Sequence, residues 1–459
     1  MQLPEALLNS LERIKGFNRA SFIRIHESGE QVNSIRLNLA KPIDSSHQSL
    51  IYNLSSLIPK SVPWEKLGCY LPQRPSYTFD PLFHAGCYYV QEASSMFLGH
   101  ALRECFDLSQ PLKVLDLCAA PGGKSTHIQS LISPGSILVS NEVIRSRVNV
   151  LKENIIKWGA GNTVITRNDP ADFRQLENYF DLIVVDAPCS GSGLFRRDTD
   201  AIKEWSEDAV KLCNRRQQRI LEDAWPALKE NGVLIYATCS YSKEEDEDIV
   251  DRLLQEHQAV SIPLPVNSDW GIVEIKTAAG ASAYRFFPDK LKGEGFFLAC
   301  LRKINTENTN GPGRGNKMET PDKKEMQIIG GWIKEGSVEL VRNDKTIYAW
   351  PAGARPDFEL LISRLRVIYS GVVVGEMARD KLIPDHSLAL SNLLHPSVIR
   401  TELDKKEAIR FLQKKELKST LPKGWQVACF EGHALGWMNG LGNRVNNYYP
   451  KDWRILKES

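Results

Sequence analysis

Short apolar runs alternate with longer amphipathic stretches over residues 86–303. Alternation of this kind is typical of a mostly parallel α/β sheet that is covered by helices. The longest expected helix is Ser206–Lys229, interrupted near Pro226, and a late hairpin is expected from Tyr284–Pro288 and Gly295–Arg302. The runs expected to form the parallel strands are Lys113–Cys118, Ser136–Val143, Asn162–Asp169, Phe180–Ala187 and Gly232–Ser240.

The segments on either side of this region have different patterns. At the N-terminus we expect a helix over Pro4–Ile14, a strand over Asn33–Asn38 and a loop through Pro81. Residues 305–324 are polar and glycine-rich without an apolar period, which predicts a mobile linker. The tail then shows strand-like runs at Thr346–Trp350 and Arg366–Val374, a helix over Thr401–Leu417 and an aromatic, glycine-rich β region.

These patterns divide the chain into a small mixed N-terminal domain, a central α/β domain, a linker, an accessory domain and a C-terminal β-rich module. A chain of 459 residues is too long for a single hydrophobic core, which agrees with several domains. The predicted boundaries are 1–85, 86–304, 305–324, 325–395 and 396–459.

Composition narrows the class of protein. The nine cysteines form no CxxC pair and are odd in number, so we expect neither a disulfide framework nor a zinc site, and no metal. No apolar run is long enough to span a membrane, and the start lacks the pattern of a signal peptide. We therefore expect a cytoplasmic, reduced protein. A net charge of +2 neither favours nor excludes nucleic acid.

A glycine-rich turn follows the first parallel strand, where backbone N–H groups become accessible to a polar ligand. It matches neither GxGxxG nor the phosphate loop, so a plain tight turn stays open as an alternative. Glu142 and Asp169 end the next two strands, where carboxylates contact ribose and adenine in doubly wound folds, and Asp186 ends the fourth. The residues of the turn are Cys118, Ala119, Ala120, Pro121, Gly122, Gly123 and Lys124.

Two cysteines follow the fourth and fifth parallel strands: Cys189 in Asp-Ala-Pro-Cys-Ser and Cys239 in Ala-Thr-Cys-Ser. Neighbouring parallel strands end at the same edge of a sheet, so both thiols should face one cavity beside the glycine turn. A single cysteine is usually a small core residue, and we interpret the other cysteines outside the turn in that way. A pair of thiols beside a ligand turn instead indicates sulfur chemistry on an electrophilic ring.

At these residues the chain resembles the RNA (cytosine-5) methyltransferases of the Nol1/Nop2/Sun family. The similarity covers about residues 86–303 and implies a Rossmann-like fold that uses S-adenosylmethionine as its cofactor. The motifs that carry it are Tyr89-Val-Gln-Glu-Ala-Ser-Ser95, Asp116-Leu-Cys-Ala-Ala-Pro-Gly-Gly-Lys124, Asp186-Ala-Pro-Cys-Ser-Gly-Ser-Gly193 and Tyr236-Ala-Thr-Cys-Ser240.

The resemblance implies a role for each of four residues. Cys239 is the nucleophile that adds to C6 of cytosine, and Cys189 takes part in release of the enzyme. Asp186 hydrogen-bonds the N3/N4 edge of the base, and Lys124 organises the site electrostatically. The cofactor would be held by the turn from Cys118 to Lys124, with Glu142, Asp169 and Asp186.

The tail resembles the PUA-like end of the bacterial small-subunit rRNA methyltransferase subgroup. This implies RNA as partner, in particular 16S rRNA in a 30S subunit and its decoding region, and no DNA or membrane; we expect a monomer. Phosphate-contact candidates are Arg196, Arg197, Arg215 and Arg216, and candidate stacking rings are Trp425, Trp437, Tyr448, Tyr449 and Trp453. Core packing explains at least half of these rings equally well.

Three alternatives are weighed against this interpretation. DNA cytosine methyltransferases use the Pro-Cys cysteine as nucleophile, so the additional Thr-Cys-Ser favours the RNA class. A non-catalytic ribosome-assembly factor would be expected to have lost one of the cysteines or the glycine turn, and this chain has them all. Within the enzyme class, tRNA and 23S rRNA stay open as targets.

Overall fold

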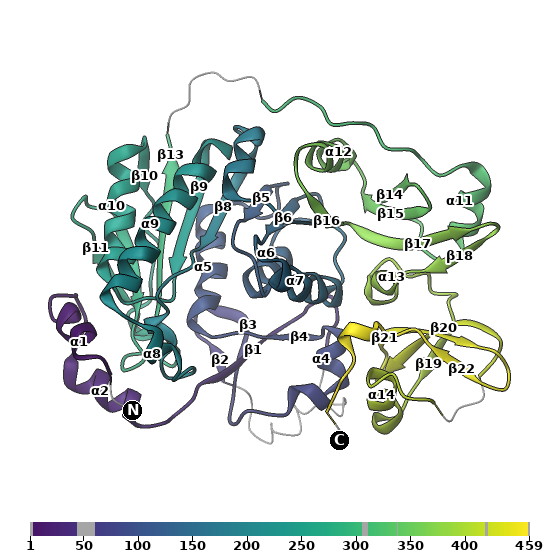
Figure 1. Ribbon diagram of the computed structural model, residues 1–459, viewed down its shortest axis with the longest axis horizontal. Coiled ribbons are helices and arrows are strands. Elements are labelled where there is room, and N and C mark those ends of the chain that lie inside the picture. Colours follow the sequence, from purple (N-terminus) through teal and green to yellow (C-terminus); the bar gives the residue numbers. More distant parts are fainter. Residues whose placement is uncertain (1–2, 44–59, 305–310, 337, 418–420, 458–459) are drawn as a thin grey trace.

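The computed structural model describes residues 3–43, 60–304, 311–336, 338–417 and 421–457 (Figure 1). A long central sheet has the strand order β11-β12-β13-β9-β8-β5-β6-β7-β16, and β10 pairs with β13. The strands from β9 to β7 run parallel, while β13 enters antiparallel beside β9. The bounds are β5 Lys113–Asp116, β6 Ile137–Asn141, β7 Thr163–Thr166, β8 Phe180–Asp186, β9 Leu228–Thr238, β10 Ala259–Ser261, β11 Val273–Lys276, β12 Ser282–Phe286, β13 Phe296–Lys303 and β16 Val367–Ser370.

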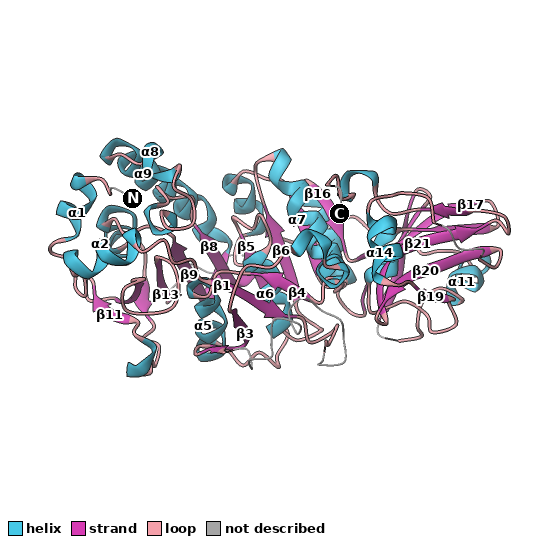
Figure 2. Cartoon of the chain, turned by 90° about the horizontal axis from the view of Figure 1, so that it is seen from below, coloured by secondary structure: helices cyan, strands magenta, loops and turns pink. Residues whose placement is uncertain are grey.

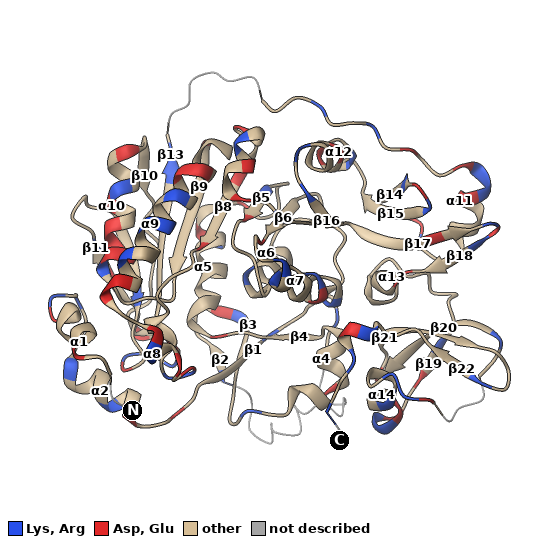
Figure 3. Cartoon of the chain, in the orientation of Figure 1, with Lys and Arg blue, Asp and Glu red and all other residues tan. Residues whose placement is uncertain are grey.

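Both faces of this sheet are buried, which explains the continuous apolar runs. Leu115 and Ile183 pack towards α9 and α10, whereas their neighbours Val114 and Leu182 pack towards α5 and α6. Figure 3 shows charged residues along α9 and α10 and few on the central strands. The helices of this region are α5 Phe97–Cys105, α6 Gly123–Leu131, α7 Arg145–Trp158, α8 Ala201–Glu204, α9 Glu207–Ala224 and α10 Glu247–Glu256, with the 3₁₀ turns η3 Pro170–Leu176, η4 Ser192–Leu194, η5 Trp225–Ala227, η6 Lys243–Glu245 and η7 Ser268–Trp270.

The longest expected helix begins as predicted but ends earlier. Ser206 caps α9 by accepting a hydrogen bond from the backbone of Ala209. Pro226 has no N–H for a helical hydrogen bond, so α9 stops at Ala224 and β9 already begins at Leu228. The predicted end at Lys229 was therefore wrong.

The N-terminal domain is built on a small antiparallel sheet of order β2-β3-β1-β4. The loop expected through Pro81 contains β3, so that prediction was wrong for this segment. Strand β4 pairs with β1, so the sheet of the N-terminal domain extends beyond the predicted boundary at residue 85. The elements are α1 Glu5–Leu11, α2 Arg19–Glu27, β1 Asn33–Leu37, β2 Ser61–Val62, β3 Glu65–Leu71, η1 Tyr77–Phe79, α4 Pro81–Ala85, β4 Tyr88–Val90 and η2 Ser94–Met96.

The segment after the linker is joined to the catalytic sheet. Gly371 has a φ of +61° and turns the chain, so the run expected as one strand over Arg366–Val374 is split into β16 and β17. Strand β16 then pairs antiparallel with β7 at the edge of the central sheet. The other elements here are α11 Lys323–Gly330, β14 Val338–Asn343, β15 Thr346–Pro351, α12 Arg355–Arg364, β17 Val372–Ala378, β18 Lys381–Pro384 and α13 His386–Leu390, with the sheet order β14-β15-β17-β18.

Part of the predicted linker lies against α12. The backbone N–H of Met318 donates to Glu359 at 2.9 Å, and Arg355 donates to the hydroxyl of Thr320 at 3.0 Å. Residues 305–310 of the same prediction lie outside the described residues. The described part of this segment is therefore packed on the protein, in contrast to the expected mobile linker.

The C-terminal module forms the sheet β19-β20-β21-β22. The helix expected over Thr401–Leu417 was wrong at its start, because Thr401 lies in β19 and Asp404 caps α14. The module shares a core with the N-terminal domain, in which Phe411 and Leu435 cluster with Leu82. Figure 2 shows α1 and α2 at one end of the molecule and β20 and β21 at the other. The elements are β19 Arg400–Glu402, α14 Lys405–Leu412, β20 Gly424–Phe430, β21 His433–Gly440, β22 Val445–Asn447 and η8 Lys451–Trp453. Within the described part of the chain, no helix has the length and apolarity needed to cross a membrane.

Candidate active site

The two predicted thiols lie together at the carboxyl edge of the central sheet. Cys189 follows β8 and Cys239 follows β9, and the parallel register pairs Asp186 with Ala237. The two Sγ atoms are 3.0 Å apart, and both side chains are half-buried. The contact with Cys239, with burial adding to it, raises the pKa of Cys189 well above its ordinary value. Cys189 is therefore held as a neutral thiol that can exchange a hydrogen bond with Cys239.

Glycines allow the loop after Cys189 to cross over the end of β9. The N–H of Gly193 donates to the carbonyl of Cys239 at 2.8 Å, and the carbonyl of Gly193 accepts from Gly295 at 3.0 Å. A Cβ atom on Gly193 would lie 2.6 Å from the oxygen of Gly295 and 2.7 Å from that of Cys239. A larger residue would therefore push the two cysteine loops apart.

A buried carboxylate joins the two cysteine loops. Glu245 accepts hydrogen bonds from the backbone N–H of Ser190 at 2.8 Å and from its hydroxyl at 2.5 Å. It also accepts from the hydroxyl of Ser240 at 2.7 Å and from Gln217 at 3.2 Å. Ser190 and Ser240 each directly follow a cysteine, so one side chain fixes the position of both thiols. Burial raises the pKa of Glu245 even though these donors oppose the shift.

Sequence reasoning did not identify Glu245 or Gln217. The run from Lys243 to Asp246 has the composition of a solvated helix start, and nothing in its pattern reveals that Glu245 is fully buried. The available signal was chemical: two serines that follow two converging cysteines need a common hydrogen-bond acceptor when they are buried.

Lys124 and Asp186 connect the glycine turn to the thiols. The ammonium of Lys124 lies 2.7 Å from the carboxylate of Asp186 and 5.2 Å from the centre of the Phe296 ring. Burial lowers the pKa of Lys124, but Asp186 and then Cys239 outweigh that effect, so the net shift is upward. A charged lysine is thus held between the turn and Cys239, as expected for a residue that stabilises developing negative charge.

The predicted cofactor turn is connected to Glu142 by an arginine. Arg147 donates to the carbonyl of Ala120 at 2.6 Å and pairs with Glu142 at 3.3 Å. Glu142 also accepts from the backbone N–H of Ile144 at 2.9 Å, which fixes the carboxylate at the end of β6. Gly122 adopts a φ of +112°, a conformation that favours glycine at this point of the turn.

Carboxylates dominate the electrostatics of the turn. Burial raises the pKa of Cys118, and the neighbouring charges of Asp116, Asp186 and Glu142 raise it further. Burial raises the pKa of Asp116 to about 7, although Ser125 donates to it at 2.6 Å. The other oxygen of Asp116 has no hydrogen-bond partner among the described residues. This arrangement fits a ligand that carries positive charge, as S-adenosylmethionine does on its sulfonium and ammonium groups.

Asp169 lies at the margin of this arrangement. It follows β7, accepts from the N–H of Ala171 at 3.2 Å and pairs with Arg219 at 3.1 Å. Its side chain is 49% exposed, which leaves one side open to a ligand. A contact with adenine therefore stays a prediction for this residue.

The predicted RNA-contacting residues divide into exposed and buried groups. Arg196 is buried: it donates to the carbonyl of Gly293 and pairs with Glu294, so the prediction that it contacts phosphate was wrong. Arg197, Arg215 and Arg216 are exposed.

The same division holds for the aromatic rings. Trp437 and Tyr449 belong to the core, which excludes them as stacking platforms. Tyr448 is 44% exposed and packs against Trp425 at 4.5 Å between ring centroids. Trp453 is half-buried, with its ring 5.0 Å from that of His386.

Three family models match the chain. Residues 105–302 match "16S rRNA methyltransferase RsmB/F", residues 3–93 match the "N-terminal domain of 16S rRNA methyltransferase RsmF", and residues 398–455 match the "Methyltransferase RsmF PUA domain". The first model contains both cysteines and the glycine turn. The other two place related domains on either side of it.

Related proteins align over most of their lengths. The chain is 30% identical to Ribosomal RNA small subunit methyltransferase F of Shewanella loihica, covering 91% of this chain and 88% of the relative. It is 31% identical to the protein of that name from Klebsiella pneumoniae, covering 91% and 89%.

Solved structures support the fold. A methyltransferase homologue from Pyrococcus horikoshii has a TM-score of 0.51 and 29% identity, over 66% of this chain and 100% of that one. NSun6 from the same organism, solved with SFG, has a TM-score of 0.54 and 19% identity, over 66% and 99%.

Proposed function

The chain belongs to the family of ribosomal RNA small subunit methyltransferase F, and we propose that it methylates C5 of one cytosine in 16S rRNA. The observation that carries this proposal is the pair of thiols at 3.0 Å beside a carboxylate-lined turn. Methyl transfer to a ring carbon requires a nucleophile on the ring next to a methyl donor, and this edge of the sheet brings the two requirements together.

S-adenosylmethionine is the cofactor that the family implies, and it supplies an electrophilic methyl group. Its sites are the turn from Cys118 to Lys124, with Glu142 for the ribose and Asp169 for the adenine edge. The carboxylates around Cys118 favour its positive groups, and the connection from Arg147 to both Glu142 and Ala120 holds the two parts of the site together. Asp186 contacts both the cofactor and the cytosine in this proposal.

Cys239 acts as the nucleophile. Its thiolate adds to C6 of cytosine, the electron pair moves through the ring towards N3, and C5 becomes nucleophilic enough to accept the methyl group. Asp186 hydrogen-bonds the N3/N4 edge, and the charged Lys124 stabilises the negative charge that develops on the ring.

Cys189 completes the turnover. A base must remove the proton from C5, and the electron pair of the C5–H bond then forms the C5–C6 double bond and expels Cys239 as a thiolate. The thiol of Cys189 lies beside Cys239, where it can donate a hydrogen bond to the departing thiolate and so assist release.

The target proposed here is a cytosine in the decoding region, presented in a 30S subunit. Flipping a base out of folded rRNA costs a few kcal/mol, so contacts outside the active site are needed. The PUA module, with Tyr448 exposed beside Trp425, supplies a surface for such contacts.

Methyl transfer from labelled S-adenosylmethionine to isolated 30S subunits, 50S subunits and bulk tRNA tests this proposal. We expect 30S subunits that lack the modification to be the preferred substrate, with 5-methylcytosine as the product. Preferential methylation of tRNA or of 50S subunits would overturn the target, and any other methylated nucleoside would overturn the chemistry.

A further inference from the structure

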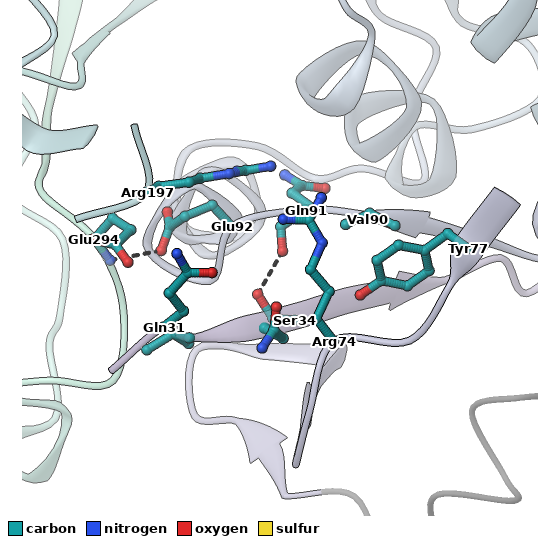
Figure 4. Close-up of a pocket in the computed structure, with 11 residues that line it drawn as sticks. Gln31, Ser34, Arg74, Tyr77, Val90, Gln91, Glu92, Arg197 and Glu294 are labelled. Carbon is teal, nitrogen blue, oxygen red and sulfur yellow. Dashed lines mark hydrogen bonds between the residues drawn. The ribbon is translucent and has the colours of Figure 1, made fainter. Parts of the chain in front are cut away.

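A small pocket lies where the N-terminal domain meets the loops of the catalytic domain (Figure 4). Its volume is about 40 Å³. In the close-up, Arg74 and Tyr77 extend from the N-terminal domain, while Arg197 and Glu294 come from the catalytic domain. The walls used in the argument are Gln31, Arg74, Tyr77, Glu92, Arg197 and Glu294.

Hydrogen bonds connect the wall of this pocket to the nucleophile. The backbone N–H of Glu294 donates to Glu92 at 2.9 Å. The next residue, Gly295, donates to the carbonyl of Gly193, and Gly193 donates to the carbonyl of Cys239. The wall of the pocket is therefore connected through backbone hydrogen bonds to the loop that carries Cys239.

Two arginines of the pocket are free to bind a ligand. Arg74 and Arg197 are exposed, and neither side chain has a hydrogen bond or ion pair with the described residues. Both act on Tyr77: burial raises the pKa of this tyrosine, and the two arginines oppose the shift. The hydroxyl of Tyr77 is buried without a partner in the described chain. Two cations and one unused hydroxyl thus converge on the same space.

The two acidic residues of the pocket differ in their hydrogen bonds. Glu92 accepts from the backbone N–H groups of Ser94, Ser95 and Glu294. Glu294 is buried, and its Oε2 lies 3.7 Å from Arg196 without a hydrogen-bond partner among the described residues. Burial raises the pKa of Glu294 to about 7, with Arg196 and Arg197 opposing the shift and Glu92 adding to it. Arg74 and Arg197 are therefore the exposed charged residues of the pocket wall.

The chemistry of the arginines favours a phosphate as the ligand. The pocket volume of about 40 Å³ is enough for a group of that size. Arginine binds phosphate through paired N–H donors, and protein–nucleic acid complexes use such contacts to fix the register of the strand. Resting on the proposed function, we propose that Arg74, Arg197 and Tyr77 bind a backbone phosphate of the RNA strand beside the reacting cytosine.

The salt dependence of RNA binding tests this proposal in the full-length protein. The probes are a fluorescein-labelled single-stranded RNA and 30S subunits reconstituted on unmodified 16S rRNA. Arg74→Ala/Arg197→Ala should raise the Kd for the labelled RNA by roughly tenfold or more at low salt. The slope of log Kd against log salt should fall by about 0.7, because the double variant loses its contact with one phosphate of a single strand.

Two further variants separate phosphate binding from a general loss of charge or fold. Arg379→Ala removes an exposed arginine from the turn between β17 and β18, far from the pocket, and should leave the slope unchanged. Arg74→Lys/Arg197→Lys keeps the charge, so it should restore the slope and part of the affinity. S-adenosylmethionine binding should be equal in all variants, which shows that each of them is folded.

The outcomes distinguish this proposal from the proposed function. If the wild type methylates 30S subunits and the double alanine variant has the wild-type slope and KM, the phosphate site is refuted. An equal loss of affinity in Arg379→Ala would also refute it. If the wild type does not methylate 30S subunits but the slope still falls in the double variant, the target is wrong while the phosphate site stands.

Discussion

Around the glycine turn after β5, the carboxylates of Asp116, Glu142 and Asp186 surround the half-buried Cys118, whereas after β8 and β9 two thiols are positioned by the single carboxylate of Glu245. The carboxylates at the glycine turn attract a cation. The loops after β8 and β9 instead hold two sulfur atoms at a fixed separation. Lys124 and Asp186 lie between the two regions. The difference implies that cofactor affinity and methyl transfer are separable, and each prediction below tests that separation.

The largest effect is expected at the nucleophile. Cys239→Ala should reduce methyl transfer by at least about 1000-fold, because C5 is not activated without addition at C6. The affinity for S-adenosylmethionine, measured by calorimetry, should stay within about twofold of the wild type. Cys69→Ala, which changes a half-buried cysteine of β3, is the control and should retain activity. Substantial turnover by Cys239→Ala would show that the roles are assigned wrongly.

The second cysteine should give a different defect. Cys189→Ala should still form the bond between Cys239 and C6 but release it slowly, so a covalent RNA–protein adduct accumulates. A denaturing gel with labelled 16S rRNA fragments should show a shifted band that the double variant Cys189→Ala/Cys239→Ala lacks. A folded, cofactor-binding Cys189→Ala protein without this band would contradict the release role.

Glu245 tests whether the distance between the thiols matters. Glu245→Ala should lower kcat by roughly 10–100-fold, since Ser190 and Ser240 lose their common acceptor and the two loops separate. Glu245→Gln should recover part of the loss, and both variants should bind S-adenosylmethionine as the wild type does. The matched control is Glu244→Gln, which changes the exposed neighbour. An unchanged kcat in Glu245→Ala would mean that the hydrogen bonds from Ser190 and Ser240 to Glu245 do not contribute to methyl transfer.

At the cofactor site, the effects should be smaller and confined to binding. Glu142→Ala and Asp169→Ala each remove a charged acceptor worth about 1.5–3 kcal/mol, so the affinity for S-adenosylmethionine should fall roughly tenfold or more. Glu142 is the more rigidly held of the two and should give the larger loss. Exposed Glu177→Ala is the control. Wild-type affinity in both variants would place the ligand elsewhere.

The sequence was informative where local chemistry and local structure coincide. Continuous apolar runs predicted the parallel strands, and the residues that end them predicted the meeting of Cys189 and Cys239. The pairing of β16 with β7 could not be predicted, because it joins segments far apart in the chain through backbone hydrogen bonds that carry no residue signature. The burial of Arg196 and Glu245 likewise depends on partners from distant segments, and their charge alone suggested exposure.

The segment after Arg302 packs against both the central sheet and the N-terminal domain, which limits the use of truncations. β16 covers the edge of β7, and Phe411 packs with Leu82 of the N-terminal domain. Removing everything after Arg302 would expose both surfaces, so a truncation tests stability as much as RNA binding. Point substitutions at exposed residues such as Tyr448 are the better test of the C-terminal module.

The most direct test of the central claim is a map of 5-methylcytosine in 16S rRNA after reaction with the wild type and with Cys239→Ala. Bisulfite sequencing of 30S subunits reconstituted on unmodified 16S rRNA gives this map at single-nucleotide resolution. The account predicts one protected cytosine in the decoding region with the wild type and none with Cys239→Ala. Protection that persists in Cys239→Ala, or a wild-type reaction that leaves 16S rRNA unprotected, would contradict it.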